Sequence, residues 1–445
     1  MRIRLRWLSP LLILLSACST TNSHTNLKST ATPGPPIKTR LAIDDSRSRD
    51  GTLFILALSG GGSRAAYLST RVMFRLQNLY AADGLDMLSR VDAISSVSGG
   101  SLPAAYYAIS TDPGEPRLHG RVWEEQRVGR LMRKNYIARW FGNWFWPYNI
   151  GRFWFTAYDR TDIMAQTFAD NLFDDASSGR DLTLADINPE RPWLVLNATN
   201  GTEGQFGEPF TFTGEDFARL GSDAASYELS RAVMATATFP AVFNYMTLRN
   251  YAAGDGGAEY IHVFDGGNYD NLGLKSVLRM LDTARANGVE FERLVVVLVD
   301  AYTDAAGVNS KRPDTRGFFD FIVDTNFIDA TDSLLTANRS GTLNRFHDHL
   351  RHNYPASKSV FYHIRIADLT DTRLRDAMNR IKTDFRLRDG EAETIDAAVA
   401  SLMSADNPCL VAIRRLLEGR DNAGPQRCPP HDDEVGAAPE DAPAP

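Results

Sequence analysis

Residues 52–62 read TLFILALSGGG and residues 91–100 read VDAISSVSGG, so each is a strand-like run that ends in a glycine turn. The first run is apolar, as expected for a parallel strand buried on both faces. Apolar residues from Ala66 to Leu76 recur at helical spacing after the first turn, and residues 102–109 predict a helix after the second. Two successive strand-turn-helix units predict an α/β fold with a mainly parallel sheet.

Further elements continue this pattern. Trp193–Leu196 and the run LVVVLV at Leu294–Val299 predict two more strands, the second of them central in the sheet. Helical spacing predicts helices at Asp324–Ala337 and Glu391–Met403. A net charge of −7 and the absence of a basic stripe argue against nucleic acid as a partner.

The start of the chain predicts export and lipidation. Three arginines precede an apolar run at Leu11–Leu15, and the run ends in the lipobox Leu15-Ser16-Ala17-Cys18. The run is much shorter than the roughly 20 residues that span a bilayer. We therefore expect residues 1–17 to be a cleaved signal peptide and Cys18 to carry the acyl chains of a membrane anchor. Ser19 is not the aspartate that retains lipoproteins at the inner membrane, which favours the outer membrane of a Gram-negative bacterium.

Composition divides the rest of the chain. Residues 18–50 are rich in Ser, Thr and Pro and predict a flexible tether. We expect a main α/β domain at 51–305 with an aromatic-rich insertion at about 112–165. A helical part at 306–430 and a disordered tail at 431–445 follow.

Two cysteines remain after Cys18, and export places them in a compartment that favours disulfides. A bridge between Cys409 and Cys428 would close a loop of about 19 residues and stabilise the fold by roughly 3 kcal/mol. The alternative is two separate buried thiols. We predict the disulfide.

Ser98 is the candidate nucleophile. It lies in Ser96-Val97-Ser98-Gly99-Gly100, the G-x-S-x-G elbow with its first glycine replaced by serine. Taken alone, such a serine is more often a helix N-cap. The loop Gly60-Gly61-Gly62 lies on the preceding strand-helix unit, however, so its amides would reach the same sheet edge and stabilise an oxyanion. Arg64 adds positive charge nearby.

The same glycine loop has a competing interpretation. Residues 60–65 also fit the dinucleotide fingerprint G-x-G-x-x-A between a strand and a helix. Such a site needs an acidic residue at the end of the second strand, whereas Asp92 lies near its start. A dinucleotide-binding oxidoreductase is therefore a less favoured alternative.

A nucleophilic serine needs a base, and no histidine is well placed by motif. Two Asp-Gly-Gly triplets are candidates, at Asp255 and Asp265. Asp255 falls in a run of turn residues between two strand-like segments, which a hairpin loop explains. Asp265 ends the strand-like run Tyr260–Phe264, and catalytic groups of α/β sheets gather at strand ends. We therefore expect Asp265 to be the base.

Four segments in sequence now resemble one family. The loop Gly60–Arg64, the Ser98 elbow, the segment Ala232–Phe243 and Phe264–Gly267 look like the ordered motifs of the patatin-like phospholipases. The resemblance spans about 210 residues, roughly half of the mature chain. It implies a three-layer α/β/α fold, a Ser-Asp dyad and hydrolysis of ester bonds in phospholipids or other acyl lipids.

The resemblance also implies roles by position. Ser98 would be the nucleophile, Asp265 the base, and the amides of Gly60, Gly61 and Gly62 the oxyanion hole. The proposed chemistry itself needs no metal or other cofactor. The sequence departs from the family pattern at Ser96, in place of the elbow glycine, and at Ala65, in place of the glycine that follows the arginine. A lipid-binding lipoprotein without catalysis, which keeps the fold, remains an alternative function.

Two further segments carry weaker signals. Trp140–Phe155 (WFGNWFWPYNIGRFWF) fits either a membrane-facing surface or an aromatic subdomain packed over the acyl pocket, and we prefer the second. His347, His349 and His352 have basic neighbours, so we interpret them as a solvated helix face rather than a metal site.

Overall fold

The computed structural model describes residues 24–30, 37–41, 43, 51–202, 207–240, 242–303 and 325–429. The predicted signal peptide, Cys18 and the tail at 431–445 lie outside the described residues. None of the described helices is both long and apolar enough to cross a membrane.

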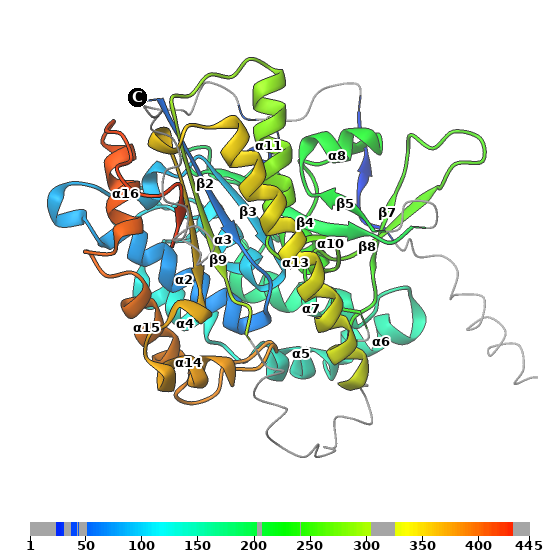
Figure 1. Ribbon diagram of the computed structural model, residues 1–445. Helices are drawn as coiled ribbons and strands as arrows, with labels where there is room; N and C mark the ends of the chain where they lie inside the picture. Colours follow the sequence, from blue (N-terminus) through cyan, green and yellow to red (C-terminus); the bar gives the residue numbers. More distant parts are fainter. Residues whose placement is uncertain are drawn as a thin grey trace, which may run out of the picture.

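A nine-stranded sheet forms the centre of the molecule (Figure 1). Its parallel part, in spatial order, consists of β11 (Arg427–Cys428), β10 (Ser359–Arg365), β9 (Arg293–Asp300), β2 (Thr52–Leu58), β3 (Ala93–Val97) and β4 (Trp193–Asn200). Three antiparallel strands complete it: β8 (Tyr260–Asp265), β7 (Met246–Arg249) and β5 (Glu208–Thr211). The predicted α/β class with a mainly parallel sheet is confirmed.

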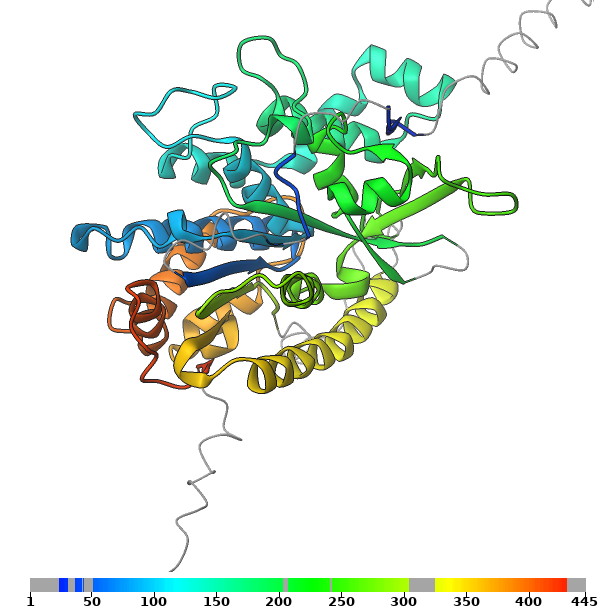
Figure 2. The same cartoon turned by 90° about the horizontal axis from the view of Figure 1, so that it is seen from above.

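The central strands separate two apolar cores. Phe54, Leu56 and Leu58 of β2 belong to one core, and Leu53, Ile55 and Ala57 belong to the other, because successive side chains of a strand point to opposite faces. The second core is covered by α11 (Leu274–Ala286) and α13 (Thr325–Asn353). The other helices that contribute to the first core include α2 (Gly62–Asn78), α3 (Ser101–Ile109), α4 (Glu125–Met132), α5 (Tyr136–Trp144), α7 (Arg160–Phe168), α8 (Gly214–Arg219), α9 (Leu229–Ala235), α14 (Thr372–Asn379), α15 (Glu391–Leu402) and α16 (Pro408–Leu417). Figure 2 shows the resulting three layers, with α11 and α13 on one face of the sheet and α2 on the other.

Part of the predicted tether is ordered, which corrects the expectation of a flexible segment at 18–50. Strand β1 (Leu27–Lys28) pairs with β6 (Ser222–Asp223), and the Asn26 side chain donates to the Ser222 hydroxyl at 3.0 Å. Leu41 and Ile43 are buried in the core beneath α11. Composition suggested a tether, but these few apolar and amide side chains find buried partners on the main body.

The C-terminal part, expected to be helical, also contributes strands. Strand β10 pairs in parallel with β9 along its whole length, and β11 pairs with β10. The Cys409–Cys428 disulfide joins α16 to β11 across a Cα–Cα distance of 5.5 Å. The expected boundary at 305/306 therefore cuts through one continuous sheet, because the open edge of β9 is filled from the C-terminal part.

Candidate active site

Ser98 occupies a backbone conformation that few non-glycine residues adopt. Strand β3 ends at Val97, and Ser98 follows with a φ of 48°, before a 3₁₀ turn at Ser98–Gly100 leads into α3. A positive φ at a serine stores backbone strain, which is characteristic of functional turns and matches the nucleophile elbow.

The two glycine turns press against each other, backbone to backbone. A Cβ on Gly99 would lie 2.0 Å from the carbonyl oxygen of Gly62, and a Cβ on Gly100 would lie 2.7 Å from that of Ser59. A Cβ on Gly60 would approach the Ser98 Cβ to 3.2 Å. The glycine loop and the elbow thus lie in contact, as their positions on successive parallel strands led us to expect.

Ser96 takes part in a hydroxyl network behind the elbow. The Ser101 hydroxyl donates to Ser96 Oγ at 3.1 Å, and the Thr236 hydroxyl donates to Ser101 Oγ at 3.1 Å. All three side chains are buried. The serine that replaces the usual elbow glycine therefore fits without displacing the turn.

Asp265 reaches Ser98 because β3 and β8 share one edge of β4. Asn197 of β4 pairs with Val97 at the end of β3, and the next residue, Ala198, pairs with Asp265 at the end of β8. Strand β5 pairs with both Asn197 and Ala198, so β5 occupies the opposite edge of β4. Strands β3 and β8 therefore run toward each other along the same edge, and their ends meet at Ser98 and Asp265.

The turn that follows Asp265 is closely packed against β4. A Cβ on Gly266 would lie 2.2 Å from the carbonyl oxygen of Asn197, so the turn after Asp265 needs a residue without a side chain. Asp265 ends a strand, as the sequence predicted, but β8 is antiparallel to β4, so Asp265 does not lie at the carboxyl end of a parallel strand. The register of β4 brings it beside Ser98 instead.

The Ser98 hydroxyl donates to Asp265 Oδ2 at 3.0 Å. The backbone N–H of Gly267 donates to the other carboxylate oxygen, Oδ1, at 2.8 Å. Burial raises the pKa of Asp265 to about 6, although the hydrogen bonds from Gly267 and Ser98 act in the opposite direction. Asp255 is exposed in the loop between β7 and β8, so the hairpin explanation for it is correct.

The amides of the glycine loop are not equivalent. The sequence predicted the Gly60 amide as an oxyanion donor, but its N–H donates to the carbonyl of Asn271 at 3.0 Å. The structure records no acceptor for the N–H groups of Gly61 and Gly62 among the described residues. These two amides remain available to a ligand.

The carbonyl of Asp384 partly occupies the amino-terminal end of α2. The Ser63 N–H donates to the carbonyl of Asp384 at 2.7 Å, and a Cβ on Gly62 would lie 2.3 Å from the same oxygen. A dinucleotide site needs these helix-terminal amides for its pyrophosphate. A carbonyl oxygen in this position disfavours that alternative.

Arg64, the predicted supporting charge, is buried and bound to main-chain carbonyls. Its Nε donates to Ala301 at 2.9 Å and its Nη1 to Ile381. The guanidinium joins the start of α2 to the end of β9 and to the segment after α14. It therefore positions the glycine loop.

Two asparagines near the site were not predicted. Asn271 Oδ1 lies 2.3 Å from the place that a Cβ on Gly60 would take, and 2.9 Å from the corresponding place on Gly267. The Asn197 side chain donates to Ser95 Oγ at 2.9 Å and to the Ser96 carbonyl at 2.8 Å. Asn271 follows the Asp-Gly-Gly triplet by a few residues, but an asparagine in a turn carries no signal of its own in the sequence.

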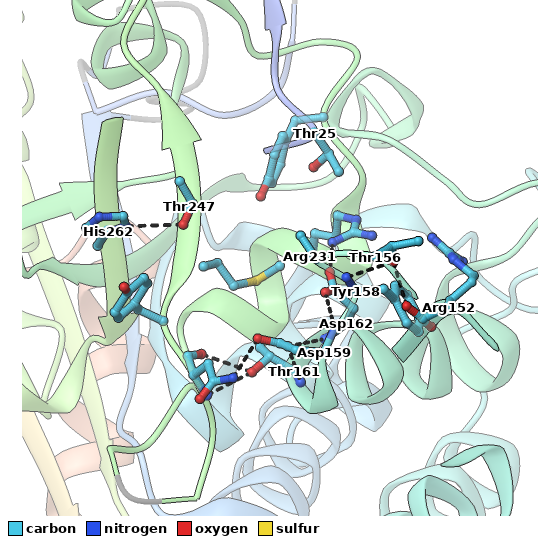
Figure 3. Close-up of a pocket in the computed structure, with 15 residues that line it drawn as sticks. Thr25, Arg152, Thr156, Tyr158, Asp159, Thr161, Asp162, Arg231, Thr247 and His262 are labelled. Atoms are coloured by element: carbon cyan, nitrogen blue, oxygen red, sulfur yellow. Dashed lines mark hydrogen bonds and ion pairs between the residues drawn. The ribbon is translucent and has the colours of Figure 1, made fainter. Parts of the chain in front are cut away.

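The structure also contains a cavity of about 500 Å³ (Figure 3). Neither Ser98 nor Asp265 lines it. Its walls include Thr25, Arg152, Tyr158 and His262, and the His262 ring lies 3.1 Å from the Thr247 hydroxyl.

The three histidines of α13 do not form one solvated face, which corrects the expectation. His347 is buried and packs against the Phe361 ring at 5.2 Å. His349 lies 3.8 Å from Asp282, whereas His352 is exposed. The helix turns His347 toward the sheet because β10, absent from the prediction, lies beneath it.

The structure thus has a three-layer α/β/α fold, and the turn at Ser98 lies beside the buried Asp265 carboxylate. The resemblance to the patatin-like phospholipases led us to expect both features. A family model described as "Patatin-like phospholipase" matches residues 56–278, half of the 445 residues. The chain belongs to this family, and at the level of the family it is a lipid hydrolase.

The other comparisons add a distant likeness. The crystal structure of VipD from Legionella pneumophila matches with 12% sequence identity and a TM-score of 0.31, over 88% of this chain and 72% of that chain. The comparison with curated proteins found no match.

Proposed function

We propose that this protein is a serine acyl hydrolase of the phospholipase A or lysophospholipase type, with Ser98 as nucleophile and Asp265 as base. The observation that carries the proposal is the 3.0 Å hydrogen bond from the Ser98 hydroxyl to a buried carboxylate whose pKa is raised to about 6. A base with a pKa close to the working pH is suited to taking a proton and returning it.

The proposed reaction has two halves. Ser98 Oγ attacks the acyl carbonyl while its proton passes to Asp265, and the amides of Gly61 and Gly62 stabilise the oxyanion. Asp265 then gives the proton to the leaving alcohol. In the second half Asp265 takes a proton from a water molecule as the water oxygen attacks the acyl carbonyl. The bond between the acyl carbon and Ser98 Oγ then breaks, the fatty acid is released, and Asp265 returns the proton to Ser98 Oγ.

The proposal is tested by labelling with a fluorophosphonate, which reacts with activated serines. We expect covalent labelling of the wild-type protein and none of Ser98→Ala, because the buried Asp265 carboxylate would activate this serine. The exposed Ser177 provides a matched control, and Ser177→Ala should label like wild type. A folded wild-type protein that binds lipid vesicles without being labelled would instead favour the non-catalytic lipid-binding function.

The raised pKa predicts a pH dependence. Hydrolysis requires ionised Asp265, so kcat/KM for a water-soluble ester should rise about tenfold per pH unit below pH 6 and level off above it. The profile measures this directly between pH 4 and pH 8. A plateau that extends unchanged down to pH 4 would contradict the assignment of Asp265 as base.

We also propose the setting of the reaction. The lipobox supports an acyl anchor on Cys18 and retention at the outer membrane of a Gram-negative bacterium. An anchored ester hydrolase remains beside a bilayer, so its substrate would be a phospholipid or another acyl lipid rather than a soluble ester.

A further inference from the structure

The segment that surrounds helices α5 and α6 (Pro147–Phe155) is cationic. Residues 126–158 contain six Lys and Arg side chains and no Asp or Glu, so their charge is +6. Since the net charge of the whole chain is −7, the remaining residues together carry −13. A cationic segment within an acidic protein is complementary to an anionic surface. The charge therefore indicates which kind of partner this region attracts.

Helix α6 buries a polar side chain and exposes aromatic side chains to water. Its buried residue is Asn149, which is 8% exposed, whereas Trp154 is 69% exposed. An ordinary amphipathic helix at a protein surface places these side chains the other way round. The aromatic face, as we call it, consists of Phe141, Phe145, Trp146, Tyr148, Ile150, Trp154 and Phe155, all of them exposed.

The backbone that carries the aromatic face is held firmly. Trp140 of α5 is buried, packs against Phe243 and donates from its indole N–H to the carbonyl of Arg160 at 2.9 Å. The Asn149 amide donates to the carbonyl of Asn143 at 2.9 Å. The segment therefore divides into a packed side and an exposed side, whereas the sequence favoured packing alone. These bonds orient the exposed side.

Helix α5, which carries part of the aromatic face, begins at a residue that is linked to the glycine turn of the candidate active site. The N–H of Tyr136, the first residue of α5, donates to the carbonyl of Phe385 at 3.0 Å, and Ser63 in the glycine turn donates to the adjacent carbonyl, that of Asp384. Two successive residues thus connect α5 to the turn beside Ser98. In Figure 1, α14, α5 and α6 follow one another from left to right along the lower part of the molecule.

The N-terminal segment leads to the same region. His24 forms an isolated parallel β-bridge with Thr247. Thr247, Thr25 and Arg152 of α6 line one cavity (Figure 3). Cys18 precedes His24 by six residues, which reach at most about 22 Å. An acyl chain on Cys18 would therefore enter a bilayer within reach of α6.

We infer that the aromatic face is a docking surface for an anionic lipid bilayer. Tryptophan, tyrosine and phenylalanine side chains enter the interface between head groups and acyl chains, and the surrounding arginines contact the acidic head groups. Docking holds the glycine turn toward the membrane. The inference is independent of catalysis, since it concerns binding alone.

The test measures insertion of the tryptophans. All variants carry Ser98→Ala, so that lipid is not degraded, and the purified protein is mixed with vesicles of phosphatidylcholine that contain 30% phosphatidylglycerol and brominated acyl chains. Bromine quenches only tryptophans that reach the bilayer. Trp123, Trp140 and Trp193 are buried in the protein, so Trp146→Ser/Trp154→Ser should remove at least about two thirds of the quenching. Val411→Ser, which removes an exposed apolar side chain from α16, should leave it unchanged.

A second pair of variants tests the charge. Arg139→Glu should lower the ratio of docked to undocked protein about tenfold on the anionic vesicles and have little effect on pure phosphatidylcholine. Arg373→Glu, an exposed arginine of α14, is the matched control.

The results separate this inference from the proposed function. Equal quenching of Ser98→Ala and of the double tryptophan variant in the same background would overturn it, whatever the enzymatic activity of the wild type. It would also be overturned if the wild type sediments as a dimer in solution that the double variant does not form, with no quenching by vesicles, because the face would then bind a second copy. Quenching without any fluorophosphonate labelling of the Ser98 protein would support docking and contradict only the proposed catalysis.

Discussion

Asp265→Asn is expected to lower kcat/KM for acyl esters by at least about 10³-fold, whereas Asp255→Asn leaves it unchanged. The amide keeps the size of the carboxylate but cannot accept the Ser98 proton, and general-base catalysis contributes about 10²–10⁴-fold. Asp255 is exposed in a hairpin loop and serves as the matched control, since it begins the same Asp-Gly-Gly triplet. Steady-state rates on a water-soluble ester measure both variants.

The same substitution should make the protein more stable at neutral pH. The pKa of Asp265 is raised from 3.8 to about 6 on folding, so between these values the unfolded chain loses its proton first and stability falls as the pH rises. Above pH 6 the cost is complete, about 2–3 kcal/mol, and asparagine avoids it. Chemical denaturation should show a gain for Asp265→Asn at pH 7 and none at pH 3.5. An inactive variant that is also less stable at pH 7 would indicate damage to the fold rather than loss of a base.

Gly99→Ala is expected to remove most of the activity and to destabilise the protein. Its Cβ would lie 2.0 Å from the carbonyl oxygen of Gly62, and a backbone atom cannot rotate away as a side chain does. The elbow and the glycine loop would have to separate. Overpacking of this kind costs up to about 3 kcal/mol, and a displacement of about 1 Å at a reacting centre costs about 10²-fold in rate.

Gly254→Ala is the control for that change, because a Cβ there meets nothing within 4 Å. Its activity and midpoint of thermal unfolding should equal those of wild type. If Gly99→Ala keeps full activity, the contact between the two turns is not needed for the reaction, and the amides of Gly61 and Gly62 lose their proposed role.

The sequence predicted the elements that depend on neighbouring residues. The strand at Thr52–Leu58 lies where the apolar run predicted it, and the helix at Glu391–Leu402 differs by one residue at its end. Such runs are recognisable because a buried strand and an amphipathic helix each impose a short period on the chain. Strand β10 escaped prediction, since its place depends on the open edge of β9, a feature more than 50 residues away.

The candidate site shows the same division. Ser98 and the glycine loop could be identified from the sequence, because an elbow and a glycine turn are each made of consecutive residues. The pairing of Asp265 with Ser98 was inferred from a motif, but its cause, the shared edge of β4, lies in the register of three strands. The Gly60 N–H donates to the carbonyl of Asn271, which lies 211 residues later in the chain.

The sequence by itself determined the α/β class, the strand-turn-helix units and the serine at the second turn, because these follow from the spacing of neighbouring side chains. Only the tertiary structure decided which backbone amides of the loop stay free, which carboxylate meets the serine, and which aromatic side chains face outward. Each of these depends on atoms that come from distant parts of the chain. Their contacts are set by packing and strand register, which local periodicity does not record.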